Sequence, residues 1–381
     1  MLLNNITIKK KIMKKKLILF MPSLEGGGVE KNFFIIANFF IKKLDDVSVI
    51  TISKKYRYKF NKKISFISTK YFFWDNFGRI TKYIISLYLL FTEYLKNKNL
   101  TVFCFQGNVL CIIFCKILNI KIIIRPNSSP SGWSQNVFKK YIFIYTLKLA
   151  NRIIVNSFMF KSELKNKLNI NAECIYNPLN YKEIKKLSKK KIEKWSFKKN
   201  SLKIINVGRL VDQKDQITIL KAINYIKNKV NISLLIIGEG KKKKKLMKYI
   251  HSNNLEKIVK IKDHTKNPFP YIKSADIFIL SSIFEGLPNV LLEAIALNSF
   301  VISTDCPTGP SEILDKGKGG FLFKMSNHKD LSNKILAYIK DKKSYDKKLK
   351  FAHKRLNRFN YDLNLKKYFN ITNNLMNLEN D

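Results

Sequence analysis

This chain of 381 residues has no cysteines at paired spacing and no long apolar run, and it has few acidic residues. Its five cysteines are odd in number and lack the paired spacing of a metal-binding motif, which favours a reduced, cytoplasmic protein without disulfides. No run of roughly 18 apolar residues occurs, which excludes a membrane-spanning helix. The apolar run 17–21 is short and precedes no small-residue cleavage site, so it favours a first strand over a secretory signal.

Acidic residues are few relative to basic ones. The chain has 27 Asp and Glu and 72 Lys and Arg, which gives a net charge of +45. Such a chain is compatible with nucleic acid or with an anionic membrane surface. The lysines are spread along the chain, however, and no nucleic-acid-binding signature occurs, so we expect no nucleic-acid partner. The basic, aromatic-rich segments 79–94 and 138–145 leave two alternatives: peripheral attachment to anionic lipid, or ordinary buried helices with lysines outside.

What the sequence does contain is a twice-repeated alternation of short apolar runs with longer amphipathic ones. This alternation predicts an α/β protein with two doubly wound parallel sheets, and the length also favours two domains. The first set of expected strands is 16–21, 47–53, 101–105, 121–125 and 152–156. The second set is 203–208, 233–238, 259–262, 276–280 and 300–304.

A change in composition marks the expected domain boundaries. An Asn-Pro turn at Asn177 and Pro178 precedes a polar, lysine-rich stretch that lacks the apolar residues of a core. We therefore expect an N-terminal domain over 1–180, a linker over 181–200 and a C-terminal domain over 201–342. Amphipathic helices over 343–381 need a partner for their apolar faces. The aromatic group Phe72, Phe73 and Trp74 leaves two alternatives, contact with lipid or acceptor and, as the favoured one, core packing.

The segment 281–294 carries the strongest chemical signal, since it places Glu285 and Glu293 on either side of a loop-to-helix junction. Gly286 and Pro288 stop any preceding helix, and Pro288 suits a first helical position. The new helix therefore begins about one turn before Glu293. Backbone N–H groups at its start attract an anion, and Glu293 can accept hydrogen bonds from hydroxyls. The alternative is that both glutamates are only charges at a helix start.

Two other segments end expected strands of the second set, where open parallel sheets bind ligands. Gly208 is followed by Arg209 and Lys214, a planar fork and a mobile point charge that suit one diphosphate. Gly238 and Gly240 would let the backbone approach a flat ligand. A fourth segment, 303–312, has a proline and a glutamate that suit a helix start whatever its function.

In this combination and order, the motifs are highly specific. The chain resembles glycosyltransferase family 4, retaining transferases of the two-domain GT-B fold, over its whole length. The resemblance rests on four motifs: Gly27-Gly28-Val29-Glu30, Gly208-Arg209-Leu210 with Lys214, Gly238-Glu239-Gly240, and Glu285-Gly286-Leu287-Pro288 with Glu293. The segment 267–272, before Ala275 and Asp276, is similar to that of envelope polysaccharide and lipid-linked glycan enzymes.

The resemblance implies two Rossmann-like domains facing across a cleft, with a nucleotide-diphosphate sugar as donor. Arg209 and Lys214 would hold the donor diphosphate, Glu285 would touch the donor sugar and Glu293 the ribose. The terminal helices would cross back onto the first domain. The full set of expected donor-binding residues is Gly27, Gly28, Gly208, Gly238, Gly240, His264, Gly286, Leu287, Pro288, Asn289 and Glu293.

The resemblance also implies a reaction, namely retaining transfer of a hexose or N-acetylhexosamine. The expected donor is a UDP-sugar and the expected acceptor a glycan or glycolipid of lipid-linked or lipopolysaccharide type. No Asp-x-Asp occurs, so we expect no catalytic metal and no cofactor. Many family members have a histidine in the first domain, whereas none precedes His251 here, and Asn127 or Ser128 would take its place.

Rival functions fit less well. A dinucleotide fingerprint would need glycine at Lys31 and an acidic residue after the second strand, and both are missing. A nucleotide-sugar epimerase of the same fold stays as an alternative, although its acid and base residues cannot be placed. A basic nucleic-acid-binding protein is the alternative from another class, and it rests on charge alone.

Overall fold

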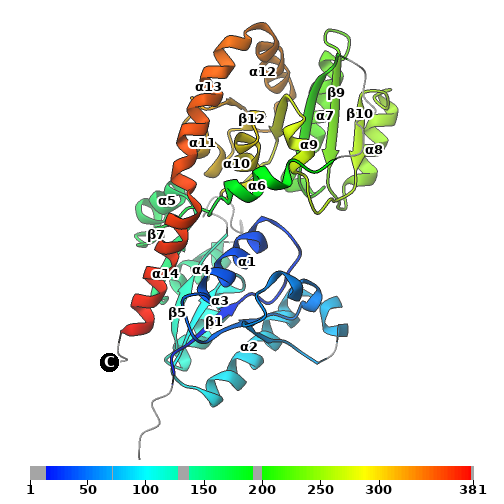
Figure 1. Cartoon of the computed structure of the whole chain (residues 1–381). Helices are drawn as coiled ribbons and strands as arrows, with labels where there is room; N and C mark the ends of the chain where they lie inside the picture. The colour runs from blue at the N-terminus through cyan, green and yellow to red at the C-terminus, as the bar shows by residue number, and fades with distance from the viewer. Residues whose placement is uncertain (1–13, 71, 128–136, 192–199, 379–381) are drawn as a thin grey trace, which may run out of the picture. The chain divides into compact units, whose positions relative to one another are not determined.

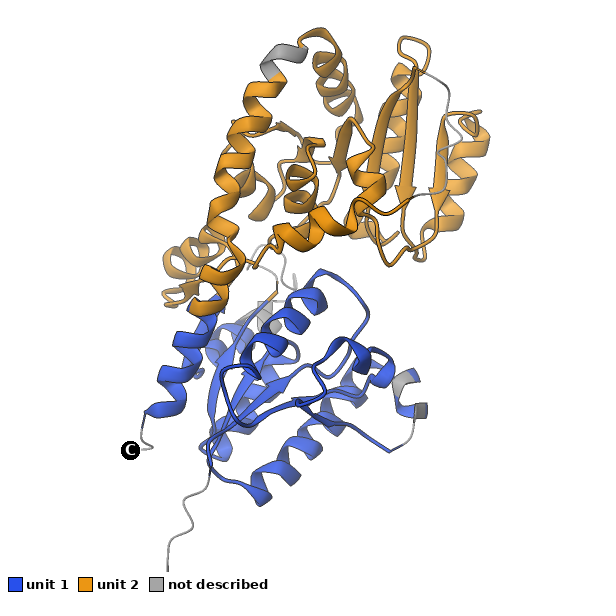
Figure 2. Cartoon of the chain, in the orientation of Figure 1, with its two compact units in different colours: residues 1–126, 136–154, 367–381 blue, residues 127–135, 155–366 orange. Residues whose placement is uncertain are grey.

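The computed structural model describes residues 14–70, 72–127, 137–191 and 200–378. The chain divides into two compact units, coloured separately in Figure 2. Unit 1 comprises Met1–Pro126, Asn136–Ile154 and Lys367–Asp381, and unit 2 comprises Asn127–Gln135 and Val155–Lys366. Each unit contains a parallel sheet with helices between successive strands (Figure 1). The expected α/β class with two parallel sheets is confirmed.

The first sheet has seven strands in the order β3-β2-β1-β4-β5-β6-β7. Its central strands are continuous apolar runs buried along most of their length, as expected for a parallel sheet covered on both faces. By pairing, β7 belongs to this sheet, whereas the contacts of residues from Val155 onward group with unit 2. The strands are β1 Lys16–Phe20, β2 Val47–Ile50, β3 Ser65–Ile67, β4 Leu100–Cys104, β5 Lys121–Ile124, β6 Arg152–Val155 and β7 Glu173–Cys174.

Helices follow the strands of the first sheet in alternation. Helix α3 carries Cys111 and Cys115 one turn apart, and both are buried thiols. The helices are α1 Gly28–Phe40, α2 Arg79–Lys96, α3 Asn108–Ile117 and α4 Val137–Lys148, with 3-10 turns at Lys54–Lys59 and Phe72–Asn76.

The last helix, α14 (Tyr361–Asn377), closes unit 1 with its C-terminal part. Its Tyr368 accepts a 3.0 Å hydrogen bond at Oη from Nε of Arg125, at the end of β5, and both side chains are fully buried. The Tyr368 ring lies 6.2 Å from that of Phe103, and the Phe369 ring lies 6.4 Å from that of Phe40. Residues from the two ends of the chain therefore share one core.

Tyr368→Phe is expected to lower the free energy of unfolding by about 1 to 3 kcal/mol, because it removes a partner of a buried guanidinium while keeping the ring. Chemical denaturation measures the loss. Tyr58→Phe is the matched control, since Tyr58 is exposed and its hydroxyl can bond to water. Equal unfolding midpoints for the two variants would contradict a structural role for this hydrogen bond.

The second sheet has six strands in the order β10-β9-β8-β11-β12-β13. Strand order reverses between β8 and β11, which is the switch point of a doubly wound sheet. The strands are β8 Leu202–Val207, β9 Ile232–Ile237, β10 Val259–Lys262, β11 Ile277–Leu280, β12 Phe300–Thr304 and β13 Phe321–Phe323. The helices of unit 2 are α5 Phe158–Leu168, α6 Tyr181–Leu187, α7 Gln216–Ile226, α8 Lys243–Ser252, α9 Phe269–Lys273, α10 Asn289–Ala296, α11 Gly309–Ile313, α12 His328–Lys340, α13 Lys342–Arg355 and the first residues of α14.

All ten expected strands are present, and their ends agree with expectation within a few residues. Three short strands, β3, β7 and β13, were not expected, because two or three residues are too few to show a period. The predicted domain boundaries at 180 and 342 stay a prediction. The contacts between residues divide the chain at other positions, among them 154 and 366. Within the described ranges, no helix combines the length and the apolar character needed to cross a bilayer.

Candidate functional site

The four segments singled out by sequence all follow strands of the second sheet. Gly208 comes directly after β8, Gly238 after β9, Ser281 after β11 and Asp305 after β12. Parallel strands bring their carboxyl ends to one edge of the sheet, and this is the edge where such sheets bind ligands. The site is therefore built on loops held by a rigid scaffold.

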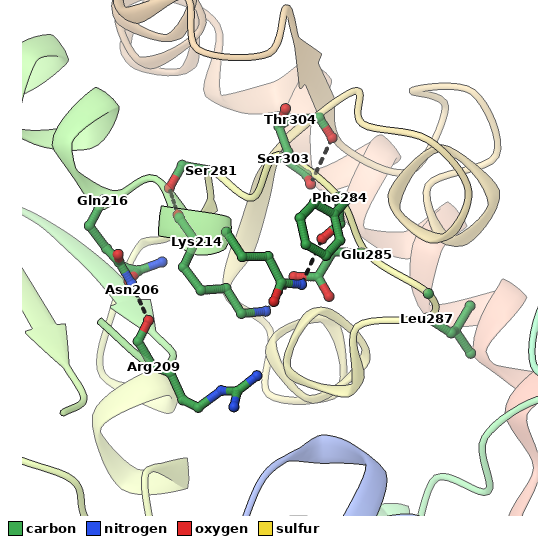
Figure 3. A network of polar contacts seen from close by, with 12 residues as sticks. Asn206, Arg209, Lys214, Gln216, Ser281, Phe284, Glu285, Leu287, Ser303 and Thr304 are labelled. Carbon is green, nitrogen blue, oxygen red and sulfur yellow. Dashed lines mark hydrogen bonds and ion pairs between the residues drawn. The ribbon is translucent and has the colours of Figure 1, made fainter. Parts of the chain in front are cut away.

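Two of these loops are joined by hydrogen bonds (Figure 3). The backbone N–H of Ile283 donates to the carbonyl of Gln213 at 2.8 Å, and Nε2 of Gln213 donates to the carbonyl of Phe284 at 2.9 Å. Oγ of Ser281 donates to the carbonyl of Lys214 at 2.7 Å. The 3-10 turn Asp212–Lys214 is thereby fixed against the loop that carries Glu285.

Lys214 and Glu285 form an ion pair between these two loops. Their side chains are only 17% and 9% exposed, so the charges are partly shielded from water and their attraction is stronger than at an open surface. Burial raises the pKa of the neighbouring Cys306 thiol to about 12, and the negative charge of Glu285 adds to the increase. Cys306 is therefore a neutral, inert thiol at physiological pH.

Arg209 lies at the rim of the same loops with an exposed side chain. Its backbone carbonyl accepts a 2.9 Å hydrogen bond from Nε2 of Gln216, which fixes the turn after β8. Figure 3 shows the side chains of Arg209 and Lys214 extending in the same direction from this turn. The structure thus brings together the two cations that the sequence pairs.

The two glycines after β9, Gly238 and Gly240, are required by packing of backbone on backbone. A Cβ on Gly238 would lie 1.9 Å from the carbonyl oxygen of Gly208, and one on Gly240 would lie 2.3 Å from that of Leu210. Gly240 also has a φ of +150°, which side chains rarely adopt. The close approach proposed for a flat ligand is therefore, in the described structure, an approach between two loops of the chain itself.

Helix α10 begins at Asn289, so Glu293 lies in its second turn, as its sequence predicted. Pro288 is the residue before the first helical one, one position earlier than expected. Asn177 fixes this junction, because its Nδ2 donates to the carbonyl of Leu287 at 3.1 Å and to Oδ1 of Asn289 at 2.7 Å. Glu293 is buried, and the side chain of Leu287 lies in the apolar core.

Thr308 is a residue of the site that the sequence did not single out. It has a φ of +72°, an unusual conformation for threonine, and its hydroxyl donates to the carbonyl of Glu285 at 2.6 Å. The N–H of Gly309 donates to the carbonyl of Gly286 at 2.8 Å. The segment after β12 therefore holds the Glu285 loop in place. The residue types of the triplet Thr308-Gly309-Pro310 do not indicate this role in the sequence.

Glu312 also differs from expectation, because it caps another helix than its own. Its carboxylate accepts from the backbone N–H groups of Phe158 and Met159 at 2.7 and 2.9 Å, at the start of α5. A carboxylate there satisfies two free donors and complements the helix dipole. The suitability of Glu312 for its own helix start was therefore an incomplete explanation.

The remaining expected site residues have separate positions. The exposed His264 donates its backbone N–H to the Glu239 carboxylate at 3.2 Å, which brings it to the loop after β9. A Cβ on Gly286 would lie 2.9 Å from the carbonyl oxygen of Asn127, so Asn127 is close to the Glu285 loop. Ser128 lies outside the described residues. Gly27 and Gly28 stand at the start of α1 in unit 1.

Metal ligands do not gather at this edge of the sheet. Among the residues that the structure describes, no group of three His, Cys, Asp or Glu side chains is placed to hold a metal ion.

The loops after β8, β9 and β11 all lie within a segment with recognised relatives. Residues 188–355 match the family model of glycosyl transferases group 1. This part of the chain belongs to the group 1 glycosyl transferases. An uncharacterized glycosyltransferase of Methanocaldococcus jannaschii is 35% identical over 207 residues, which are 51% of each chain. A Campylobacter jejuni N-acetylgalactosaminyltransferase, named for a diphospho-undecaprenol substrate, is 27% identical over 60% of this chain and 64% of its own. The matches thus span about half to two thirds of these relatives.

Solved structures extend the likeness from this segment to the whole fold. Anabaena HepE, crystallised with UDP and glucose, superposes with a TM-score of 0.75 at 16% identity and covers 94% of this chain and 100% of its own. An identity this low shows the fold alone. The fold is GT-B, as the sequence resemblance implied.

Proposed function

We propose that the protein is a retaining glycosyltransferase that moves a hexose or N-acetylhexosamine from a nucleotide-diphosphate sugar. The observation that carries the proposal is the joining of two loops through Lys214 and Glu285, with Arg209 beside them. Two cations at the carboxyl edge of a parallel sheet suit a diphosphate, and an acidic group next to them suits sugar hydroxyls. Membership of residues 188–355 in the group 1 family supports the same chemistry.

In the proposed reaction, the bond from the anomeric carbon to the diphosphate oxygen breaks, and the diphosphate keeps the electron pair. The acceptor hydroxyl oxygen bonds to the same face of the anomeric carbon and passes its proton to the departing phosphate oxygen. Arg209 and Lys214 stabilise the negative charge that builds on the diphosphate, so no metal is needed. Glu285 positions the sugar and offsets positive charge on the anomeric carbon, while Glu293 binds the ribose.

We further propose a UDP-sugar as donor and a lipid-linked or lipopolysaccharide-type glycan as acceptor, used in the cytoplasm at a membrane surface. The support comes from relatives and neighbours: HepE was crystallised with UDP and glucose, and the Campylobacter jejuni relative is named for a diphospho-undecaprenol substrate. Other relatives include a capsular polysaccharide biosynthesis glycosyltransferase of Staphylococcus aureus.

UDP is expected to raise the unfolding temperature more than GDP or a salt-matched oligonucleotide does. At a concentration of about 100 times its dissociation constant, a ligand adds roughly 2.7 kcal/mol of stability. Differential scanning fluorimetry measures the shift, and Arg209→Ala should reduce it. Lys221→Ala is the matched control, since Lys221 is an exposed cation on α7 away from these loops. A larger shift with the oligonucleotide would favour the nucleic-acid-binding alternative.

A further inference from the structure

Helix α2 of unit 1 leaves apolar side chains exposed on one face, while the opposite face buries polar residues together with Leu90. Its buried residues include Lys82, Ser86 and Glu93, spaced as one helical face. The opposite face is apolar and exposed. We call this face the outer stripe, and it consists of Ile80, Ile84, Tyr88, Phe91 and Leu95.

The exposure of the outer stripe is large. Ile80 is 71% exposed, Tyr88 65% and Leu95 63%. Apolar area left in water forgoes about 25 cal/mol per Å², so a helix that turns its isoleucines outward gives up stability in the isolated chain. Contiguous apolar patches of this kind mark binding surfaces.

The inward face shows that the helix is held in this orientation. The Glu93 carboxylate accepts from Nζ of Lys16, on β1, and from Nζ of Lys96, at 2.7 Å each. These contacts hold the pKa of Glu93 below its usual range against the opposing effect of burial, which is the largest single influence. A rotation of α2 that buried the stripe would break the ion pair with the sheet.

The apolar surface continues beyond α2. Before the helix, Phe73 and Phe77 are about half exposed, and Trp74 packs between them with ring centroids 4.6 and 5.2 Å away. The expectation that the aromatic group packs in the core is wrong for Phe73. On the other side, the rings of Phe91 and Phe114 lie 6.5 Å apart, so the exposed residues of α3 adjoin the stripe.

Charge decides which partner fits this surface. Glu93 is the single acidic residue between residues 79 and 150, and it is buried and paired. Exposed lysines adjoin the apolar helices instead: Lys96, Lys98, Lys116 and Lys148. A second copy of this chain would bring cations against cations, which opposes association. An anionic lipid surface would cover the apolar side chains and neutralise the lysines together.

We propose that the outer stripe docks on the surface of an anionic lipid bilayer. The apolar side chains would enter the boundary between headgroups and acyl chains, with the lysines against lipid phosphates and Phe73, Trp74 and Phe77 at headgroup level. This proposal rests on α2 and its neighbours alone, so it stands or falls independently of the sugar-transfer reaction.

Co-sedimentation of the full chain with vesicles, without nucleotide or acceptor, tests the proposal. We expect binding to equimolar phosphatidylcholine and phosphatidylglycerol, weaker binding in high salt and little binding to phosphatidylcholine alone. The triple variant Ile84→Ser, Tyr88→Ser and Leu95→Ser should bind on the order of 100-fold more weakly, since three apolar groups no longer enter the bilayer. The matched control replaces three exposed apolar residues of unit 2 by Ser, and it should bind like the parent: Tyr225, Met247 and Ile339.

A second measurement reports the docked face directly. The fluorescence of Trp74 should shift to shorter wavelength when anionic vesicles are added, and Trp74→Phe should remove that shift. Failure of the parent to bind, or equal binding by the stripe variant, overturns the proposal. A stripe variant that turns a dimer into a monomer, in a protein that ignores vesicles, identifies a second copy as the partner and also overturns it. Unchanged thermal unfolding shows that the variant is folded.

Discussion

Lys214→Ala is expected to lower kcat for sugar transfer by about 10²- to 10³-fold, the usual effect of removing one group that stabilises a developing charge. The variant removes a cation proposed to face the departing diphosphate. It also leaves the Glu285 carboxylate, only 9% exposed, without its ion-pair partner. That uncompensated negative charge repels the diphosphate, so the loss has two physical sources. Initial rates with a competent UDP-sugar and acceptor measure it.

The two sources are separated by adding Glu285→Gln to Lys214→Ala, because the amide keeps the shape and removes the charge. If repulsion by Glu285 contributes, the double variant binds UDP more tightly than Lys214→Ala alone, although transfer stays slow. The control is Lys221→Ala, with its exposed lysine on α7. Full activity in Lys214→Ala, with a competent donor and acceptor, would refute the site.

Gly238→Ala is expected to destabilise unit 2 by at least about 3 kcal/mol, within the range typical of severe steric changes. A Cβ there would lie 1.9 Å from the carbonyl oxygen of Gly208, and no side chain can move aside to relieve a clash with backbone. For a unit of this size, the loss corresponds to a fall of about 6 to 12 °C in Tm. Scanning calorimetry measures it.

Gly78→Ala is the matched control, because nothing lies within 4 Å of a Cβ at that position. Its effect should stay within about 0.5 kcal/mol, as for most surface changes. Gly309→Ala should resemble Gly238→Ala, since its Cβ would lie 2.1 Å from the carbonyl oxygen of Gly286. Equal melting of Gly238→Ala and Gly78→Ala would show that the β8 and β9 loops separate at little cost.

Sequence reasoning predicted the elements whose signal is local. Alternating apolar and amphipathic runs predicted ten strands, and the expected helix start before Glu293 is one residue away from the observed one. Sequence reasoning also paired Arg209 with Lys214, because a planar guanidinium and a mobile ammonium after one strand end suit a single diphosphate. The roles of these residues in binding stay predictions.

What the sequence could not predict depends on contacts between distant segments. Glu312 suits a helix start in any sequence, but only the folded chain shows that it caps α5, 154 positions earlier. Gly238 and Gly240 suggested a ligand, whereas they meet the backbone of the loop after β8. The composition of α2 could not show which face is buried. Charged residues at helical spacing usually lie on the exposed face, whereas Lys82 and Glu93 lie on the buried one.

The hydrogen bond between Arg125 and Tyr368 has a consequence for synthesis on the ribosome. Unit 1 takes residues from both ends of the chain, and all of the intervening polypeptide must be translated before Tyr368 emerges. At typical elongation rates, that interval lasts about 10 to 50 s. During this interval, the first sheet of the nascent chain lacks its final helix, and the hydrogen bond from Arg125 to the Tyr368 hydroxyl cannot form.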